Sequence, residues 1–147
     1  MKRHGFTLFE LLIVLALTAL LAGLALPRLG ASQDRLRLRQ AITQVAGHAR
    51  TARAAAIAGN QTARLRVALV DRQVSVGRGQ AYRLPQHLTL QVTTAAGLAD
   101  AETALFLFYP DGSASGGRID LISGSARQGI AIDWLTGRIR IDQAVRQ

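Results

Sequence analysis

The residue types that support catalysis are few and scattered in this 147-residue sequence. The three histidines, His4, His48 and His87, have no metal-ligand spacing, and there is no cysteine. Lys2 is the single lysine, which excludes a Walker phosphate-binding loop. Residues 112–116 (Gly-Ser-Ala-Ser-Gly) come near the nucleophile-elbow pattern, but alanine holds the central position that the nucleophile needs. The sequence therefore predicts no enzyme, no metal site and no cofactor.

One acidic residue stands inside an apolar run and is a candidate for function. Between residues 6 and 26, Glu10 is the only charged residue. A carboxylate within a bilayer costs several kcal/mol at mid-depth and less near the interface, so it usually has a partner or a role. The alternative is an interfacial glutamate in the first turn of a helix, where the helix dipole favours a negative charge.

The apolar run itself is long enough to anchor the chain in a membrane. About 20 apolar residues span the hydrocarbon core as a helix, and residues 6–27 reach that length. Lys2 and Arg3 precede the run and favour a cytoplasmic N-terminus, although Arg28 on the far side weakens this asymmetry. Two alternatives are a cleaved secretory signal peptide, with a weak site at residues 22–25, and a helix buried in a globular core.

The junction between the basic leader and the apolar run carries a more specific signal. Gly5-Phe6-Thr7-Leu8-Phe9-Glu10 resembles the prepilin signal of type IV pilins and type II secretion pseudopilins. In that family, an inner-membrane peptidase cuts after the glycine and methylates the new N-terminal residue. The resemblance implies a leader of residues 1–5, cleavage between Gly5 and Phe6, and N-methylation of Phe6. It also implies that the apolar segment is retained and that Glu10 pairs with the N-terminus of a neighbouring subunit in a filament.

Beyond the apolar run, the periodicity predicts an α+β fold in which one long helix packs on an antiparallel β-sheet domain. Pro27 should kink or locally break the helix, which leaves residues 28–59 as an amphipathic second half ending at Gly59-Asn60. The apolar stripe of this half has six members at steps of three and four: Leu38, Ile42, Val45, Ala49, Ala52 and Ala56.

Residues 60–147 change to a period of two, which predicts a β-rich domain. Proline and glycine fall between the alternating runs, where turns belong. The predicted strands are a run over residues 64–69, a second run that follows a turn at 71–72 and ends near residue 76, and runs at 88–92, 104–109, 119–122, 130–132 and 139–141.

Positive charge is in excess, with 18 basic against 9 acidic residues and a formal net charge of +9. This excess favours anionic partners such as lipid head groups, nucleic acid or acidic protein faces, and it equally fits a surface kept soluble by charge. Five arginines lie on one flank of the predicted helix, about a quarter turn from the stripe: Arg28, Arg35, Arg39, Arg50 and Arg53. They form either a solvated flank or a contact for phosphates or an acidic partner.

Two segments of the β-rich part narrow the resemblance. Residues 109–117 (Tyr-Pro-Asp-Gly-Ser-Ala-Ser-Gly-Gly) have the composition of a structured loop and resemble a segment of H-type minor pseudopilins of the type II secretion system. Residues 133–140 are similar to the closing hairpin of that family. The Gly-Arg-Ile-Arg element ending this hairpin also matches a DNA-uptake minor type IV pilin, which makes Arg138 and Arg140 candidates for anion or DNA contact. The alternative for these arginines is a cross-strand ion pair with Asp133.

These resemblances predict an H-type minor pseudopilin of the type II secretion system. Such a protein is a structural subunit of the periplasmic pseudopilus, which helps export folded proteins across the outer membrane. The implied partners are the other pseudopilins, major and minor, the prepilin peptidase and the inner membrane, which the chain would cross once with its C-terminal domain in the periplasm. The alternative is a minor type IV pilin for pilus assembly or DNA uptake, with nucleic acid as a partner. A third possibility is an anchored periplasmic binding module whose leader resemblance is accidental.

Overall fold

A computed structural model describes residues 7–142 and 145–146, with the side chains of residues 22–32 and 145–146 outside the description. The chain divides into two compact units, residues 1–34 and residues 35–147, and each is described by itself. The predicted leader of residues 1–5 and the cleavage junction Gly5-Phe6 lie outside the described residues.

One helix, α1 (Leu8–Gly59), extends through 52 residues. It continues through Pro27, so the predicted local break is absent. A proline removes one backbone hydrogen bond, and the alanines and leucines on both sides of it are strong helix formers that sustain the helix. The predicted C-terminus is confirmed, because Asn60 adopts a left-handed φ of 47° and the Gln61 N–H donates to the Ala56 carbonyl at 3.2 Å.

In the first unit, the part of the helix with described side chains presents apolar residues on every face. Between residues 8 and 21 all described side chains are exposed, for example Leu8 at 81% and Phe9 at 72%. Across the residues that the structure describes, no helix combines the length and the apolar character needed to cross a bilayer. Phe6 and the side chains of residues 22–27 lie outside that description, so the anchor at residues 6–27 stays a prediction.

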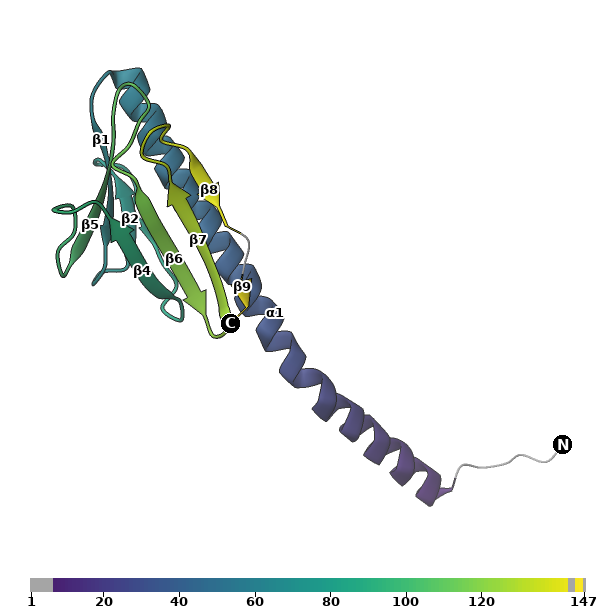
Figure 1. Ribbon diagram of the computed structural model, residues 1–147. Helices are drawn as coiled ribbons and strands as arrows, with labels where there is room; N and C mark the ends of the chain where they lie inside the picture. Colours follow the sequence, from purple (N-terminus) through teal and green to yellow (C-terminus); the bar gives the residue numbers. More distant parts are fainter. Residues whose placement is uncertain (1–6, 143–144, 147) are drawn as a thin grey trace. The chain divides into compact units, whose positions relative to one another are not determined.

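The second unit contains two antiparallel sheets beside the C-terminal part of α1 (Figure 1). The first sheet has the order β3-β2-β1-β5 and is formed by β1 (Ala63–Ala68), β2 (Gln73–Val76), β3 (Tyr82–Arg83) and β5 (Thr103–Phe108). The second has the order β4-β6-β7-β8, with β9 pairing β7, and is formed by β4 (Thr89–Thr94), β6 (Gly117–Ser123), β7 (Ala126–Ile132), β8 (Ile139–Ile141) and β9 (Val145–Arg146). The α+β class is therefore confirmed, with the β domain divided into two sheets.

Most of the predicted strands are present, and the differences concern short or polar segments. All seven predicted runs have a counterpart in β1, β2 and β4–β8. The pattern missed β3 and β9, which have two residues each and are too short to show an alternation. It also underestimated β6 and β7, whose hairpin pairs Gly117 with Ile132 at one end and Ser123 with Ala126 at the other. Cross-strand pairing carries these strands over polar residues that no apolar alternation marks.

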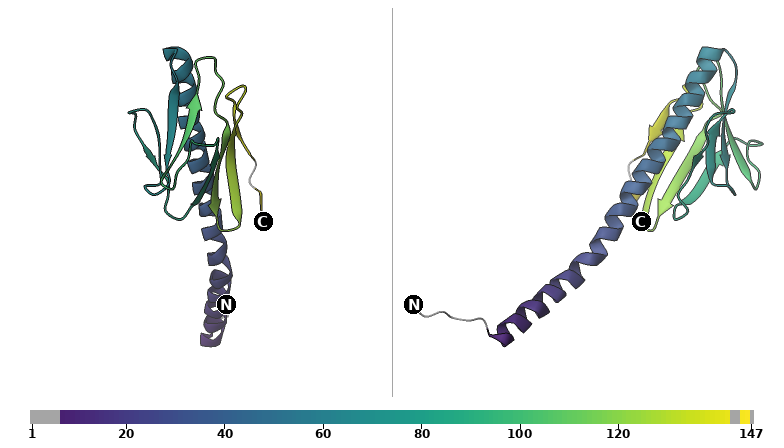
Figure 2. Two further views of the ribbon diagram at one scale, coloured as in Figure 1. Left: turned by 60° about the vertical axis from the view of Figure 1, so that its left-hand side comes forward. Right: turned by 180° about the vertical axis from the view of Figure 1, so that it is seen from behind.

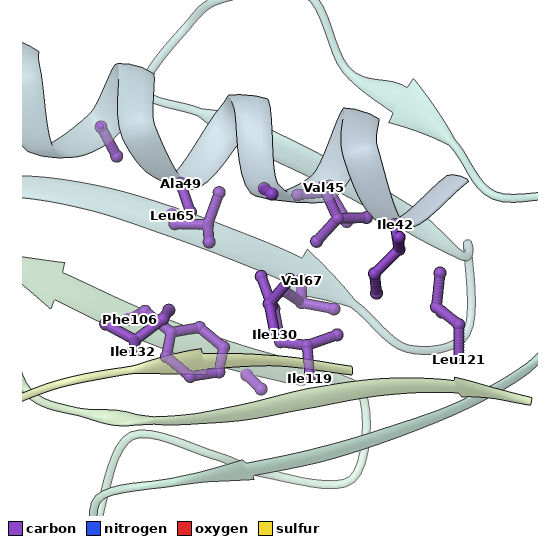
Figure 3. Packing of buried hydrophobic residues seen from close by; sticks show 14 of the residues in the cluster. Ile42, Val45, Ala49, Leu65, Val67, Phe106, Ile119, Leu121, Ile130 and Ile132 are labelled. Atoms are coloured by element: carbon purple, nitrogen blue, oxygen red, sulfur yellow. The ribbon is translucent and has the colours of Figure 1, made fainter. Parts of the chain in front are cut away.

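The core lies between α1 and the two sheets. The six residues of the predicted stripe are between 0% and 1% exposed, which confirms that face of the helix. Figure 3 shows Ile42, Val45 and Ala49 of α1 facing side chains such as Leu65 and Ile130 of the sheets. The later members of the stripe are alanines, and small side chains let helix and sheet approach closely. Figure 2 shows both sheets beside this part of α1 from two further directions.

Candidate functional site

The start of α1 is built by the residues of the leader motif that the structure describes. The Thr7 hydroxyl accepts a hydrogen bond from the Glu10 N–H at 3.2 Å, which makes Thr7 the N-cap of the helix. Glu10 stands three residues after the cap, as in a capping box, and its negative charge suits the N-terminal end of the helix dipole. The Thr-x-x-Glu spacing was visible in the sequence, but the role of Thr7 was not predicted.

The Glu10 side chain is exposed. Among residues 7–142, no hydrogen bond or ion pair involves its carboxylate. The Glu10 carboxylate is therefore free to pair with a group that does not belong to the described residues. The cleavage and methylation residues, Gly5 and Phe6, lie before this part.

The loop at residues 109–117 is structured by its own polar groups, as predicted. Asp111 Oδ1 accepts hydrogen bonds from the Ser113 hydroxyl at 2.6 Å and the Ser113 N–H at 3.0 Å. These bonds hold the pKa of the Asp111 carboxyl below its usual value. Gly112 and Gly116 have left-handed φ angles of 85° and 75°, which favour glycine.

The turn after β7 is closed by Asp133, which is not the ion-pair partner that the sequence suggested. Its Oδ1 accepts the Thr136 N–H and the Thr136 hydroxyl, both at 2.9 Å, and these bonds lower the pKa of the carboxyl, with a smaller contribution from the charge of Arg140. No ion pair links Asp133 to an arginine among the described residues. Asp133 is therefore a turn-closing residue whose side chain accepts hydrogen bonds from the residue three positions on.

Arg53 of α1 joins the loop and the turn, which the sequence presented as separate motifs. Its Nε donates to the Gly112 carbonyl at 3.1 Å and its Nη2 to the Thr136 carbonyl at 3.1 Å. The backbone of the two segments is also linked directly, since the Ala114 N–H donates to the Trp134 carbonyl at 2.9 Å. Arg53, which the sequence placed either on a solvated flank or in a contact for phosphates or an acidic partner, is thus a structural clamp between two backbone segments.

Gly137 cannot be replaced by a larger residue without disturbing the Arg53 clamp. A Cβ at this position would lie 2.2 Å from the Gly112 carbonyl oxygen and 2.9 Å from the Arg53 Nε. Its φ of 59° adds a backbone conformation that other residues rarely adopt. The Gly-Arg-Ile-Arg element therefore begins with glycine because a side chain would collide with Gly112 and Arg53. The sequence does not reveal this reason, because the three residues come from three separate segments.

The two arginines of that element are exposed and line different hollows. Arg138 precedes β8 and lines a groove that also contains Arg50 and Arg53 of α1. Arg140 lies on β8 and lines a hollow that contains Trp134. The pair predicted for anion or DNA contact is therefore divided between two surfaces. Of the other flank arginines, Arg35 and Arg39 are exposed as well, whereas the side chain of Arg28 lies outside the described residues.

A second polar cluster lies on the sheet of β6 and β7. Asp120 is 4% exposed, and its Oδ2 accepts hydrogen bonds from Arg118 Nε at 2.8 Å and Arg127 Nη2 at 3.0 Å. Arg118 also pairs with Asp142. Burial raises the pKa of the Asp120 carboxyl, but the two arginines more than offset this and hold it below its usual value. These ion pairs fasten β6, β7 and the segment after β8 together.

Comparison with known proteins gives matches to sequence and to structure. The family model of the prokaryotic N-terminal methylation motif matches residues 1–26. The chain is 34% identical over 138 residues to type II secretion system protein H of Xanthomonas campestris pv. campestris, and the match covers 93% of this chain and 82% of the relative.

Two solved structures share the fold. One is the minor pseudopilin EpsH from the type 2 secretion system of Vibrio cholerae, with a TM-score of 0.58 and 10% identity, covering 72% of this chain and 96% of that chain. The other is the type IV minor pilin FimU of Pseudomonas aeruginosa, with a TM-score of 0.58 and 15% identity, covering 76% of this chain and 95% of that chain. At these identities the likeness concerns the fold alone.

Proposed function

The chain belongs to the family of type II secretion system protein H, and from this premise we propose how it works as a minor pseudopilin. It assembles with other pseudopilins into the periplasmic pseudopilus, as a structural subunit that helps export folded proteins across the outer membrane. The observation that carries the proposal is the sequence relationship, because it extends over nearly the whole chain.

The subunit reaches its mature form by cleavage between Gly5 and Phe6 and N-methylation of Phe6, carried out by a prepilin peptidase. The match of residues 1–26 to the methylation motif supports this step. The start of the helix supports it too, because Thr7 caps α1 and a cut before Phe6 leaves the new N-terminus only one residue ahead of the cap.

The mature helix holds the subunit in the inner membrane through residues 6–27, with the second unit in the periplasm. Within the membrane, Glu10 pairs with the cationic N-terminus of a neighbouring subunit. The exposed carboxylate without a partner among residues 7–142 supports this role, since a charge in an apolar environment is stabilised by an opposite charge.

The alternative of a minor type IV pilin has weaker support. The fold does not distinguish the two functions, because the likeness to FimU is as strong as the likeness to EpsH. The DNA-uptake prediction rested on Arg138 and Arg140, which line different hollows. The sequence relationship therefore decides for the secretion system.

The test is complementation of a bacterium that lacks its own type II secretion protein H. We expect the chain to restore the release of folded enzymes into the medium, and mass spectrometry of the membrane fraction to find methylated Phe6 as the N-terminus. Glu10→Val should insert into the membrane and leave secretion near the level of the empty vector. An uncut chain, a mature chain starting after Ala25, or full secretion by Glu10→Val would contradict the corresponding step.

A further inference from the structure

We propose that the groove between the end of α1 and β8 is a docking site for an acidic, partly apolar segment of another protein. The groove is lined by residues of both elements, among them Arg50, Arg53, Ala54, Ile57, Arg138 and Ile139, and is called the Arg50–Arg138 groove. Its volume of about 520 Å³ lies within the range of protein ligand sites. All of these residues belong to the second unit of the chain.

The groove carries positive charge on both walls, and none of the described residues that line it is acidic. Arg50 comes from α1 and Arg138 from the turn before β8, and both are exposed. The ion pairs found among the described residues involve Arg118 and Arg127 of β6 and β7, which do not line the groove, so none of them neutralises it. Two guanidinium groups facing one space favour carboxylates, which arginine binds in a two-pronged geometry.

The Arg53 clamp makes the groove rigid before any ligand arrives. By holding the carbonyls of Gly112 and Thr136, Arg53 fixes the turn that carries Arg138 against α1. Neither acceptor is charged, so the positive charge of Arg53 adds to that of the two walls. A preformed site binds more tightly because less conformational freedom is lost on binding.

The floor of the groove is apolar, which adds a second requirement to the ligand. Ile57 is 46% exposed although it is large and aliphatic, and Ala54 beside it is small enough to admit an incoming side chain. Ile139 from β8 closes the other side and is half-buried. The matching ligand therefore combines carboxylates with an aliphatic or aromatic side chain that covers Ile57.

This combination favours a protein segment over nucleic acid. Single strands bind where aromatic side chains stack the bases, and Trp134, the only tryptophan, lies in the other hollow with Arg140. A phosphate backbone offers no apolar group for Ile57. A second copy of this chain is also a poor ligand, because basic residues outnumber acidic ones by 18 to 9 in the sequence, the excess remains after loss of Lys2 and Arg3, and the copies repel each other.

The experiment places a photoreactive residue at the rim of the groove in the full-length chain, produced in its own bacterium. Ala58→p-benzoylphenylalanine lies in the groove lining, whereas the matched control Ala55→p-benzoylphenylalanine lies on the same exposed helix outside it. We expect a cross-link from residue 58 to another protein, mapped by mass spectrometry to a segment with at least one aspartate or glutamate within about one helical turn, and no such link from residue 55.

Charge reversal tests the chemistry of the contact. Arg50→Glu/Arg138→Glu should lower the yield of the cross-link by roughly tenfold or more, since each charge-assisted contact is worth about a factor of ten. Arg78→Glu/Arg83→Glu changes the net charge equally at exposed positions outside the groove and should leave the yield unchanged. Changing the mapped carboxylates of the partner to arginine should restore the link, which a misfolded variant could not do.

Several results would overturn the proposal. They are a link to lipid, to nucleic acid or to a second copy, a yield indifferent to the two arginines, or the absence of any link specific to residue 58. The proposal does not rest on secretion, so its outcome is separate from the complementation test. A chain that fails to restore secretion can still show the charge-dependent link, and a chain that restores it can lack the link.

Discussion

The two ends of α1 show how differently one helix can use apolar residues. Between residues 8 and 21 the apolar side chains surround the helix and all are exposed, whereas between residues 38 and 56 a single stripe is buried to 1% or less. The second end is covered by two sheets, and its opposite flank carries polar and small residues. The comparison teaches that the angular distribution of apolar residues, more than their number, indicates which part of a helix belongs to a globular core.

The largest expected difference in the free energy of unfolding is between shortening a large aliphatic side chain at the covered end of α1 and shortening one at the exposed end. Ile42→Ala should lower the free energy of unfolding of the second unit by about 3 to 4 kcal/mol, because it opens a cavity in the core. Leu12→Ala should leave it unchanged, since Leu12 is 55% exposed. Urea unfolding of the full-length chain in detergent micelles, followed by circular dichroism of the β signal, measures both. Equal losses would mean that the first unit supports the second.

A smaller effect is expected at the Arg53 clamp, which exists only at the covered end. Gly137→Ala should cost about 2 to 3 kcal/mol, from the left-handed φ and from the clash with the Gly112 carbonyl. Gly124→Ala is the matched control, since its φ of 56° is nearly the same and no atom lies within 4 Å of the added Cβ. The same unfolding experiment should therefore give a loss of only about 1 kcal/mol there. Similar losses of unfolding free energy in the two variants would show that the left-handed φ alone, and not the contact with the Arg53 clamp, determines the cost at Gly137.

The ion pairs of Asp120 should make the covered end sensitive to acid. Asp120→Asn should cost about 2 kcal/mol at neutral pH, because the hydrogen bonds to a charged acceptor are weakened. The folded-state pKa of Asp120 is lowered, so its contribution is complete above the unfolded value near 4 and is lost as the pH falls through the folded value. Unfolding experiments along a pH series should show the difference between wild type and variant shrinking below about pH 4. A constant difference would show that Asp120 does not titrate in this range.

The smallest effect on the free energy of unfolding is expected for the exposed arginines at the covered end of α1. Substituting them should matter as little as substituting the exposed residues 8–21. Arg138→Gln/Arg140→Gln should change the free energy of unfolding by about 1 kcal/mol or less. Because the two side chains line different hollows, binding of duplex DNA to the full-length chain in micelles should be weak and fall only as the loss of two charges requires. Tight, salt-sensitive binding that disappears in this variant would favour the DNA-uptake function instead.

The sequence determined the parts of this protein that depend on local pattern. The stripe from Leu38 to Ala56, the helix end at Gly59 and the strand runs follow from side-chain period and turn residues, which short segments already contain. The family also followed from the sequence, because the relationship to a secretion protein lies in residue identity, while the fold alone fits a pilin equally.

The tertiary structure alone decided which polar residues act together. The sequence placed Arg53 on a helix flank, either solvated or in contact with an anionic partner, and only the return of residues 112 and 136 to α1 makes it a clamp. Arg138 and Arg140 share a strand pattern, yet one lines a groove beside α1 and the other a hollow that contains Trp134. Such contacts join residues 59 and 83 positions apart, and no local period encodes them. They depend on how the whole chain satisfies its buried carbonyls and charges at once.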